Sequence, residues 1–200
     1  MTRLIEFILK HNFFYSLWNK IAADYHTVLV NEYIKPTPGM RILDICCGPA
    51  YILPLLGKNV HYIGIDFNEN YIRYAKNKYT EEGYTLANFI LCDASKYEVP
   101  QDEKFDRIIM CGGMHHLSNE ELIPILNNAK HLLKESGRFC SLDGVYTENQ
   151  SYIRKFLLNM DRGKYVRNIS NYADLVKSAI PEAKYEIRSD LIITEAIIFY

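Results

Sequence analysis

Three aspartates, each inside or directly after an apolar run, are the side chains of this sequence best suited to hold a ligand. Asp44 lies within the run at residues 41–46, Asp66 follows the run at 60–65, and Asp93 follows the run at 88–92. In open α/β sheets, parallel strands end along the edge where ligands bind, and a carboxylate at a strand end can accept hydrogen bonds from ribose hydroxyls. The pattern therefore indicates a nucleoside site beside the short turn that contains Gly48.

Two adjacent histidines form the second chemically capable group. His115 and His116 follow the apolar run at 106–111, after Gly112 and Gly113. A neutral imidazole can take a proton from a hydroxyl or an amine near neutral pH, so either histidine is a candidate general base. The alternative is that one histidine packs against Met114 and the other faces solvent. Metal binding is not expected, because no ligand spacing in the sequence supports it.

The elements that position these residues alternate between strand and helix. Apolar runs predict parallel strands at 41–46, 60–65, 88–92, 106–111 and 138–143. Asn68 is predicted to cap one intervening helix, and Ser118 with Glu121 forms a capping-box pattern at the start of another. Pro124 predicts a late start or a kink in that second helix. The alternation predicts right-handed crossovers and a doubly wound α/β sheet.

The end of the chain breaks this alternation. Residues 184–188 and 194–200 read as two strands without a helix between them, which predicts a terminal antiparallel hairpin. The segment Pro36-Thr37-Pro38-Gly39 separates an N-terminal helical cap, residues 1–35, from the sheet. We expect one domain over residues 1–200, with residues 144–183 forming an insertion on the substrate side.

Several of these segments resemble a known family. The turn Cys46-Cys47-Gly48-Pro49-Ala50, with Asp44 before it and Asp66 at the next strand end, resembles motifs I and II of class I S-adenosylmethionine-dependent methyltransferases. Residues 105–117, which end in Met-His-His-Leu, look like motif IV of the small-molecule members. The terminal hairpin is similar to the sixth and seventh strands of the same family. The resemblance implies a Rossmann-like, seven-stranded mixed sheet.

The resemblance also implies an activity and a set of site residues. The activity is transfer of a methyl group from S-adenosyl-L-methionine to a small-molecule acceptor by direct displacement, giving S-adenosyl-L-homocysteine without a metal. Asp44 would orient the amino acid end of the cofactor, Asp66 would bind the ribose, and Asp93 would accept from the adenine amino group. The full cofactor set implied is Asp44, Cys46, Cys47, Gly48, Asp66, Phe67, Asp93, Ala94, Cys111 and Gly112, with His115 and His116 near the methyl group.

Two residues depart from the family pattern. Cys46 stands where the family usually has its first glycine, and Ala50 where it has the third. A β-carbon at residue 46 narrows the approach of a cofactor and disfavours a positive φ. We nevertheless expect cofactor binding to survive.

The acceptor is expected to contact the insertion. Asp143, Tyr146 and the run from Asp161 to Arg167 supply hydrogen-bonding and cationic groups over the pocket mouth. Arg162 and Arg167 could hold a carboxylate or phosphate of the acceptor. The alternative is that these arginines pair internally with Asp161 or another acid.

Composition narrows the partners and leaves alternatives open. A net charge of -1 gives no strong global field, and by itself it neither demands nor excludes a nucleic acid partner. No nucleic acid partner is expected, because the sequence has no Asn-Pro-Pro-Tyr or Asp-Pro-Pro-Tyr motif after the fourth predicted strand and no basic domain. No membrane partner is expected, because the apolar stretch at residues 4–9 is too short and too charged to span a bilayer. Five cysteines without a Cys-x-x-Cys pair suggest reduced thiols in a cytoplasmic protein. The alternatives are a catalytically inactive cofactor-binding or scaffold protein, an NAD-dependent oxidoreductase, and methylation of nucleic acid or protein. The sequence does not determine the oligomeric state.

Overall fold

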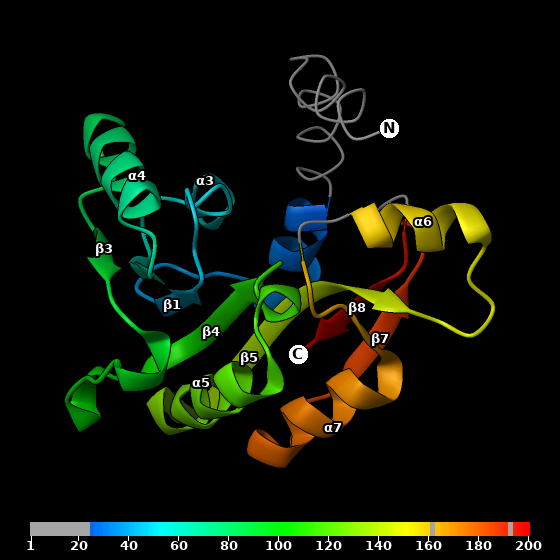
Figure 1. Ribbon diagram of the computed structural model, residues 1–200. Coiled ribbons are helices and arrows are strands. Elements are labelled where there is room, and N and C mark those ends of the chain that lie inside the picture. The colour runs from blue at the N-terminus through cyan, green and yellow to red at the C-terminus, as the bar shows by residue number, and fades with distance from the viewer. Residues whose placement is uncertain (1–24, 161–162, 192–193) are drawn as a thin grey trace.

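The computed structural model describes residues 25–160, 163–191 and 194–200, and shows a central sheet with helices on both faces (Figure 1). The strands are β1 (Arg41–Ile45), β2 (His61–Asp66), β3 (Ala87–Leu91), β4 (Phe105–Cys111), β5 (Leu133–Tyr146), β6 (Arg167–Asn168), β7 (Tyr185–Arg188) and β8 (Ala196–Phe199). The α-helices are α3 (Leu53–Leu56), α4 (Glu69–Glu81), α5 (Asn119–Leu132), α6 (Tyr152–Met160) and α7 (Ile169–Ala179). Shorter helical turns are η1 (Leu29–Ile34), η2 (Ala94–Lys96), η3 (Gln101–Glu103) and η4 (Met114–His116).

The strand order confirms the predicted fold. Within the described ranges, the sheet runs β3-β2-β1-β4-β5-β8-β7, and the short β6 pairs with the end of β5 off this path. Strands β1 to β5 pair in parallel, whereas β8 is antiparallel to both β5 and β7. The order reverses between β1 and β4, and this is the position where open α/β sheets bind ligands.

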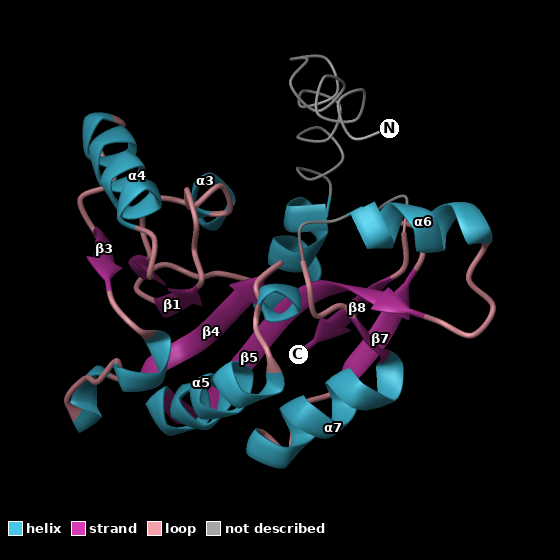
Figure 2. Ribbon diagram, in the orientation of Figure 1, coloured by secondary structure: helices cyan, strands magenta, loops and turns pink. Residues whose placement is uncertain are grey.

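The sheet is buried because its strands carry apolar side chains on both faces. On β5, Phe139 and Val145 pack in one core with α5 and α7, whereas Cys140 and Leu142 pack in a second core with η1 and α3. Figure 2 shows the strands lying between these helical layers. The two cores hold the sheet rigid beneath the ends of the strands.

Two of the helices begin where the sequence predicts. The Asn68 side chain accepts from the backbone N–H groups of Asn70 and Tyr71 at the start of α4. At the start of α5, Ser118 and Glu121 form the complete capping box. That helix begins at Asn119 and runs through Pro124, so of the two outcomes expected at the proline, a late start or a kink, the late start does not occur. The capping box supplies partners for the first-turn N–H groups, which lets the helix begin before the proline.

The N-terminal cap is described only in part. Residues 25–28 are helical, and the helical backbone continues through η1 to Ile34. Leu29, Val30 and Ile34 are buried in the second core. Residues 1–24 of the predicted cap lie outside the described residues.

The predicted insertion, residues 144–183, divides into two parts. Helix α7 packs beside α5, and its Tyr172 and Val176 lie in the first core, so α7 belongs to a layer that covers the sheet (Figure 1). Helix α6 lies near the end of β5 and contacts that strand. Residues 163–166 then lead into β6. Within the described ranges, every helix is too short or too polar to span a bilayer.

Candidate functional site

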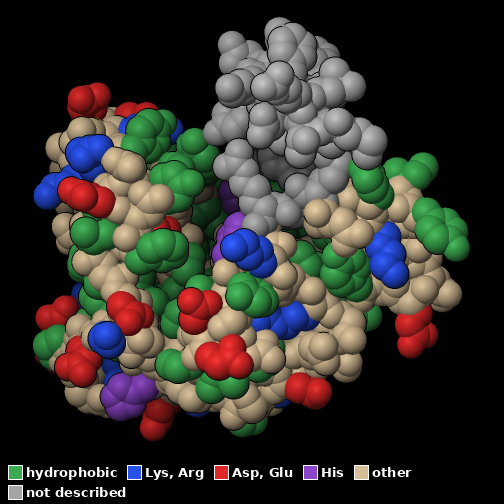
Figure 3. Space-filling view, in the orientation of Figure 1, with side chains coloured by type: hydrophobic (Ala, Val, Ile, Leu, Met, Phe, Trp, Pro, Cys, Tyr) green, Lys and Arg blue, Asp and Glu red, His purple; other side chains and the backbone are tan. Residues whose placement is uncertain are grey.

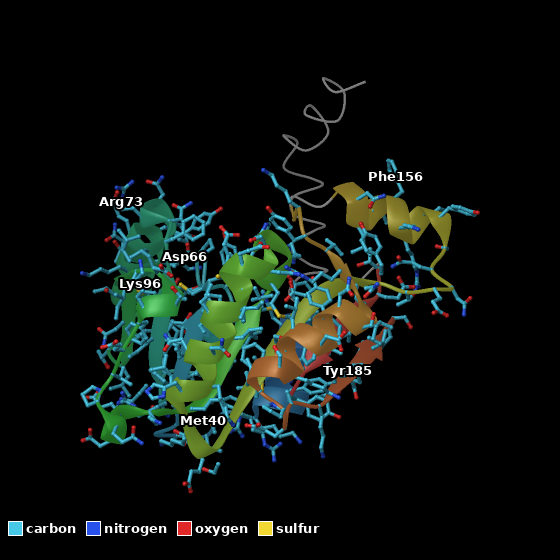
Figure 4. All side chains as sticks on the ribbon, turned by 60° about the horizontal axis from the view of Figure 1, so that its bottom comes forward. Met40, Asp66, Arg73, Lys96, Phe156 and Tyr185 are labelled. Atoms are coloured by element: carbon cyan, nitrogen blue, oxygen red, sulfur yellow. The ribbon has the colours of Figure 1, made fainter. Side chains whose placement is uncertain are left out.

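A cavity of about 1160 Å³ opens at the carboxyl ends of β1, β2 and β4. It is lined by every residue predicted to bind the cofactor and by both candidate bases: Asp44, Cys46, Cys47, Gly48, Asp66, Phe67, Asp93, Ala94, Cys111, Gly112, His115 and His116. Figure 3 shows a hollow in the molecule with histidine side chains at its edge. In Figure 4, Asp66 lies at this end of the sheet, and Met40, which precedes β1, lies at the opposite end.

The turn after β1 has three residues with a positive φ, and two of them are not glycine. Cys46 has a φ of 58° and Ala50 a φ of 56°, and Gly48 between them has a φ of 53°. A non-glycine residue in this left-handed region costs roughly 1–2 kcal/mol. Hydrogen bonds hold the turn in place, from Cys47 N to Ile65 O at 3.1 Å and from Ala50 N to Cys47 O at 2.8 Å. The β-carbon at residue 46 therefore does not prevent the positive φ.

Asp44 lies at the base of the cavity with little access to water. Its side chain is 3% exposed, and the Tyr62 hydroxyl donates to Asp44 Oδ2 at 2.6 Å. The pKa of Asp44 is raised to about 7. Burial is the largest cause, the hydrogen bond from Tyr62 opposes it, and the neighbouring Asp66 carboxylate adds to it. A cationic group in the cavity would favour the ionised form of Asp44.

Asp66, at the end of β2, links this strand to the turn after β1 by a hydrogen bond. Its Oδ2 accepts from Gly48 N at 2.9 Å, and its Oδ1 accepts from Asn68 N at 2.8 Å. Each oxygen of a carboxylate can accept more than one hydrogen bond, so both oxygens can still bind hydroxyl groups. Beside it, Phe67 is 76% exposed at the cavity wall. The site thus offers hydrogen-bond acceptors next to an aromatic face that the protein does not cover.

Asp93 has a structural role as well as a place in the cavity. Its Oδ1 accepts from Ser95 N at 3.0 Å and from Ser95 Oγ at 2.7 Å, which caps η2. These hydrogen bonds lower the pKa of Asp93. An ionised carboxylate is therefore fixed at the third strand end.

The cavity thiols are held in their protonated form. Burial raises the pKa of the thiols of Cys46, Cys47 and Cys111, and nearby aspartates add to this shift. A thiol with a raised pKa is a poor nucleophile at neutral pH. Among the described residues, no three histidine, cysteine or acidic side chains gather in a way that could hold a metal ion.

His115 is the more constrained of the two histidines. Its Nδ1 lies 2.6 Å from Asp143 Oδ1, and its ring centroid lies 4.2 Å from that of His116. The backbone after α6 crosses the same ring, because a β-carbon added at Gly163 would lie 2.0 Å from His115 Cδ2. Tyr165 N also donates to His115 O at 2.9 Å. The backbone at residues 163–165 therefore fixes the position of the His115 side chain.

Arg167 is occupied by the protein itself, so the hypothesis that it grips the acceptor is not supported. Its Nη1 donates to Met114 O and Tyr165 O, and its Nε and Nη2 donate to Asn119 Oδ1. The remaining Nη2 bond goes to Leu117 O at 2.7 Å. The structure favours the internal role, with carbonyl and amide oxygens in place of the expected acid.

Of the other two predicted acceptor residues, only Tyr146 lies within the described residues. The Tyr146 hydroxyl donates to Asn159 Oδ1, and Tyr146 is absent from the described cavity lining. Arg162 lies outside the described residues.

Sequence reasoning missed several residues of the cavity wall, namely Tyr25, His26, Tyr51 and Tyr71. Lys164 and Tyr165 also line the cavity, and both belong to the run that the sequence predicted over its mouth. The helical spacing before residue 35 predicted a cap, but nothing in the spacing marked His26 as part of the site. Burial lowers the pKa of His26 to about 4, so this ring is neutral near pH 7.

Comparison with known proteins agrees with this geometry. A family model described as a methyltransferase domain matches residues 36–187. A demethylmenaquinone methyltransferase of Listeria monocytogenes is 28% identical over 117 residues, which cover 56% of this chain and 48% of that protein. The chain thus spans about half the length of such curated relatives.

Two solved structures show the same fold. The TehB-like SAM-dependent methyltransferase of Corynebacterium glutamicum superposes with a TM-score of 0.64 at 20% identity, covering 93% of this chain and 94% of that one. Phosphoethanolamine N-methyltransferase 2 of Haemonchus contortus, solved with phosphomonomethylethanolamine and S-adenosylhomocysteine, gives 0.66 at 20% identity, covering 86% and 39%. At these identities the likeness concerns the fold alone. The family match and the terminal hairpin argue against the oxidoreductase alternative. The chain belongs to the class I S-adenosylmethionine-dependent methyltransferase family.

Proposed function

We propose that this protein transfers a methyl group from S-adenosyl-L-methionine to a small-molecule acceptor. The observation that carries the proposal is the gathering of Asp44, Asp66 and Asp93 along one cavity at the point where the strand order reverses. The turn at Gly48 lies between the first two of these acids. Membership of the methyltransferase family indicates that the nucleoside bound by these acids is S-adenosylmethionine.

The residues present fit the cofactor. Asp44, buried and without a cationic partner among the described ion pairs, suits the ammonium group of the amino acid end. Asp66 keeps acceptor capacity for the ribose hydroxyls. The exposed ring of Phe67 suits stacking on the adenine, and Asp93 with Ala94 suits the adenine edge. When bound, the cofactor supplies an electrophilic methyl group on a sulfonium.

The contribution of the protein is then mainly alignment. A direct displacement needs no covalent intermediate on the enzyme, so holding the acceptor close to the methyl carbon carries much of the rate. His115 and His116 lie in the cavity and can take a proton from the acceptor. The Cys46, Cys47 and Cys111 thiols, held protonated, take no part as nucleophiles.

The acceptor is proposed to be small and to bind beneath the segment that follows α6. Lys164 and Tyr165 of that segment line the cavity, and Tyr165 N donates to His115 O. The names of the Listeria and Haemonchus proteins describe methylation of a quinone precursor and of a phosphorylated amino alcohol, which supports a small-molecule acceptor. A cytoplasmic location without a nucleic acid partner remains part of the proposal.

A transfer assay tests this function. We expect acceptor-dependent release of S-adenosylhomocysteine when the protein is incubated with S-adenosylmethionine and a panel of quinols and phosphorylated amines. An Asp66→Asn variant should lose the release, because the ribose contacts are weakened. Cofactor binding without turnover on any acceptor would favour the inactive binding protein instead. Transfer to nucleic acid or protein, and not to the panel, would contradict the proposed acceptor class.

A further inference from the structure

Three buried polar atoms on β5 and α7 have no hydrogen-bond partner among the described residues. They are Ser141 Oγ and Asp143 Oδ2 on β5, and Tyr172 OH on α7. Ser141 and Tyr172 are fully buried and Asp143 is 1% exposed, so bulk water does not reach these atoms. A buried polar group without a partner is costly, and buried polar groups in folded proteins are nearly always paired. Each of the three atoms therefore needs a partner from outside the described side chains and backbone.

The three side chains belong to the same part of the core. Successive side chains of a strand alternate between the two faces of the sheet, so Ser141 and Asp143 lie on one face of β5. Phe139 and Val145, on that face, pack in the first core together with Tyr172. Burial raises the pKa of Tyr172, and the Asp143 carboxylate raises this pKa further, so the two groups lie close enough to interact.

The backbone beside Asp143 cannot supply the missing partner. His115 N donates to Asp143 Oδ1 at 3.1 Å, and His115 Nδ1 lies 2.6 Å from the same oxygen. Both contacts use Oδ1 and leave Oδ2 unpaired. The carbonyl of the same peptide group, Met114 O, accepts from Arg167 Nη1. Both ends of this peptide group are therefore already bonded.

The Arg167 guanidinium cannot supply the partner either. It lies over the Tyr172 ring, with Cζ 5.5 Å from the ring centroid. A guanidinium has five N–H donors, and this one makes five hydrogen bonds. The acceptors are three backbone carbonyls and one side-chain amide oxygen, namely Met114 O, Tyr165 O, Leu117 O and Asn119 Oδ1. Every donor is engaged, so none remains for Asp143 Oδ2 or Tyr172 OH.

The missing partner must be small and must donate to a carboxylate. Asp143 Oδ2 can only accept when the carboxyl is ionised, whereas the hydroxyls of Ser141 and Tyr172 can donate or accept. Water meets all three demands, and an internal water typically makes about three hydrogen bonds to buried polar groups. A monovalent cation also binds oxygen atoms, but the positive charge of Arg167 beside Tyr172 disfavours a second cation there.

We propose that one internal water molecule is bound between β5 and α7, where it donates to Asp143 Oδ2 and hydrogen-bonds to Ser141 Oγ and Tyr172 OH. The water joins the central sheet to a helix that covers it. It also gives the second carboxyl oxygen of Asp143 a partner, since the first oxygen is used by His115. This inference does not depend on the proposed methyl transfer, because it uses only contacts within the core.

The first test is a crystal structure of the wild-type chain at a resolution that shows ordered water. Density for one water should lie about 3 Å from Asp143 Oδ2, Ser141 Oγ and Tyr172 OH. Direct hydrogen bonds among these side chains, or no density between them, would overturn the proposal. An anomalous signal there after a rubidium soak would identify a cation and would also overturn it. This test needs no variant, so it decides the question even if substitutions in the core prevent folding.

The second test uses the sign of a stability change. If the Tyr172 hydroxyl were buried without a partner, Tyr172→Phe would remove a costly polar group and would raise the folding equilibrium constant. If the hydroxyl binds the internal water, the same substitution removes a hydrogen bond, and the constant should fall by about fivefold. Urea unfolding followed by circular dichroism measures this constant. A rise, or no change, would overturn the proposal.

Two other tyrosines are the matched controls for this substitution. The Tyr79 hydroxyl is buried and donates directly to Ala50 O at 2.7 Å, so Tyr79→Phe should lower the folding constant by a similar factor. Tyr152 is 93% exposed, so Tyr152→Phe should change the constant by less than about twofold. Tyr172→Phe should resemble the first control, and a result that resembles the second would contradict the bound water.

The third test asks whether the two hydroxyls share one molecule. Groups that bind the same water are coupled, so the joint effect of Ser141→Ala and Tyr172→Phe on the folding constant should differ from the product of their separate effects by about threefold or more. The control pair is Ser141→Ala with Tyr79→Phe, because Tyr79 lies in the second core, and it should give the simple product. A simple product for the first pair as well would overturn the single shared water.

Discussion

Asp44 and Asp66 are both buried aspartates of one cavity, yet their surroundings differ. Asp66 accepts from two backbone N–H groups, which suit a carboxylate. Asp44 accepts a hydrogen bond from the Tyr62 hydroxyl, and burial raises its pKa to about 7. The two acids therefore respond differently to pH and to a bound cation.

The raised pKa of Asp44 predicts pH-dependent binding of S-adenosylhomocysteine. Below about pH 7 the Asp44 carboxyl is mostly protonated, and binding the ammonium group requires it to lose that proton. The affinity should therefore rise with pH up to about 7 and level off above it. Asp44 passes its proton to the buffer on binding, so calorimetry at pH 6 in phosphate and in imidazole should give binding heats that differ in proportion to the difference between the ionisation enthalpies of these two buffers.

The matched variant for this prediction is Asp44→Asn. It cannot ionise, so its weaker binding should show the same heat in both buffers. Binding heats to the wild-type protein that are equal in the two buffers would show that Asp44 does not titrate with the ligand.

Arg167 connects two elements that are distant in the sequence, the short strand β6 and the turn η4. Its guanidinium donates to the carbonyl oxygens of Met114 and Leu117, and the side chain is buried. The turn that carries both histidines is thereby tied to the segment that covers His115. This contact makes the arrangement of the site depend on the stability of the insertion.

Arg167→Leu is predicted to destabilise the fold by about 3 kcal/mol, because buried carbonyl oxygens lose their donors. Urea unfolding followed by circular dichroism measures the loss. The matched control is Arg73→Leu on α4, where the arginine donates to the exposed Asn70, and its change should stay within about 0.5 kcal/mol. An equal, small effect of both substitutions would contradict the structural role of Arg167.

The elements that could be predicted from the sequence are those with local signals. The strand ending at Asp66, the Ser118 capping box and the terminal hairpin each depend on residues that are close in the chain. The contact of His115 with Asp143 joins residues 28 apart, and that of Arg167 with Leu117 joins residues 50 apart. The periodicity of a single strand or helix does not predict contacts between residues so far apart in the sequence. The positioning of His115 and the internal role of Arg167 could therefore be recognised only in the structure.

At the scale of the whole molecule, the cavity is a product of sheet topology. Strands β1, β2 and β4 are neighbours in the sheet, and their parallel order brings their carboxyl ends to one edge. The cofactor residues could be predicted because ligands of open α/β sheets bind at the carboxyl ends of the strands, so residues that follow different strands in the sequence are expected at the same site. Tyr25, His26 and Tyr165 also line the cavity, but they do not follow strands of the sheet. The position of strand ends therefore does not predict that they belong to the site.

The central claim is that this edge of the sheet binds the adenosyl cofactor. A calorimetric titration of S-adenosylhomocysteine into three proteins tests it: the wild type, Asp66→Asn, and Asp106→Asn. Asp106 is the matched control because its carboxylate also accepts from a backbone N–H, that of Arg41 at 2.8 Å, at the opposite end of the sheet. We predict one equivalent bound by the wild type and by Asp106→Asn, and affinity lower by about tenfold or more in Asp66→Asn. A wild-type protein that gives neither heat nor a thermal shift, or an Asp66→Asn variant that binds as tightly as the control, would contradict the account.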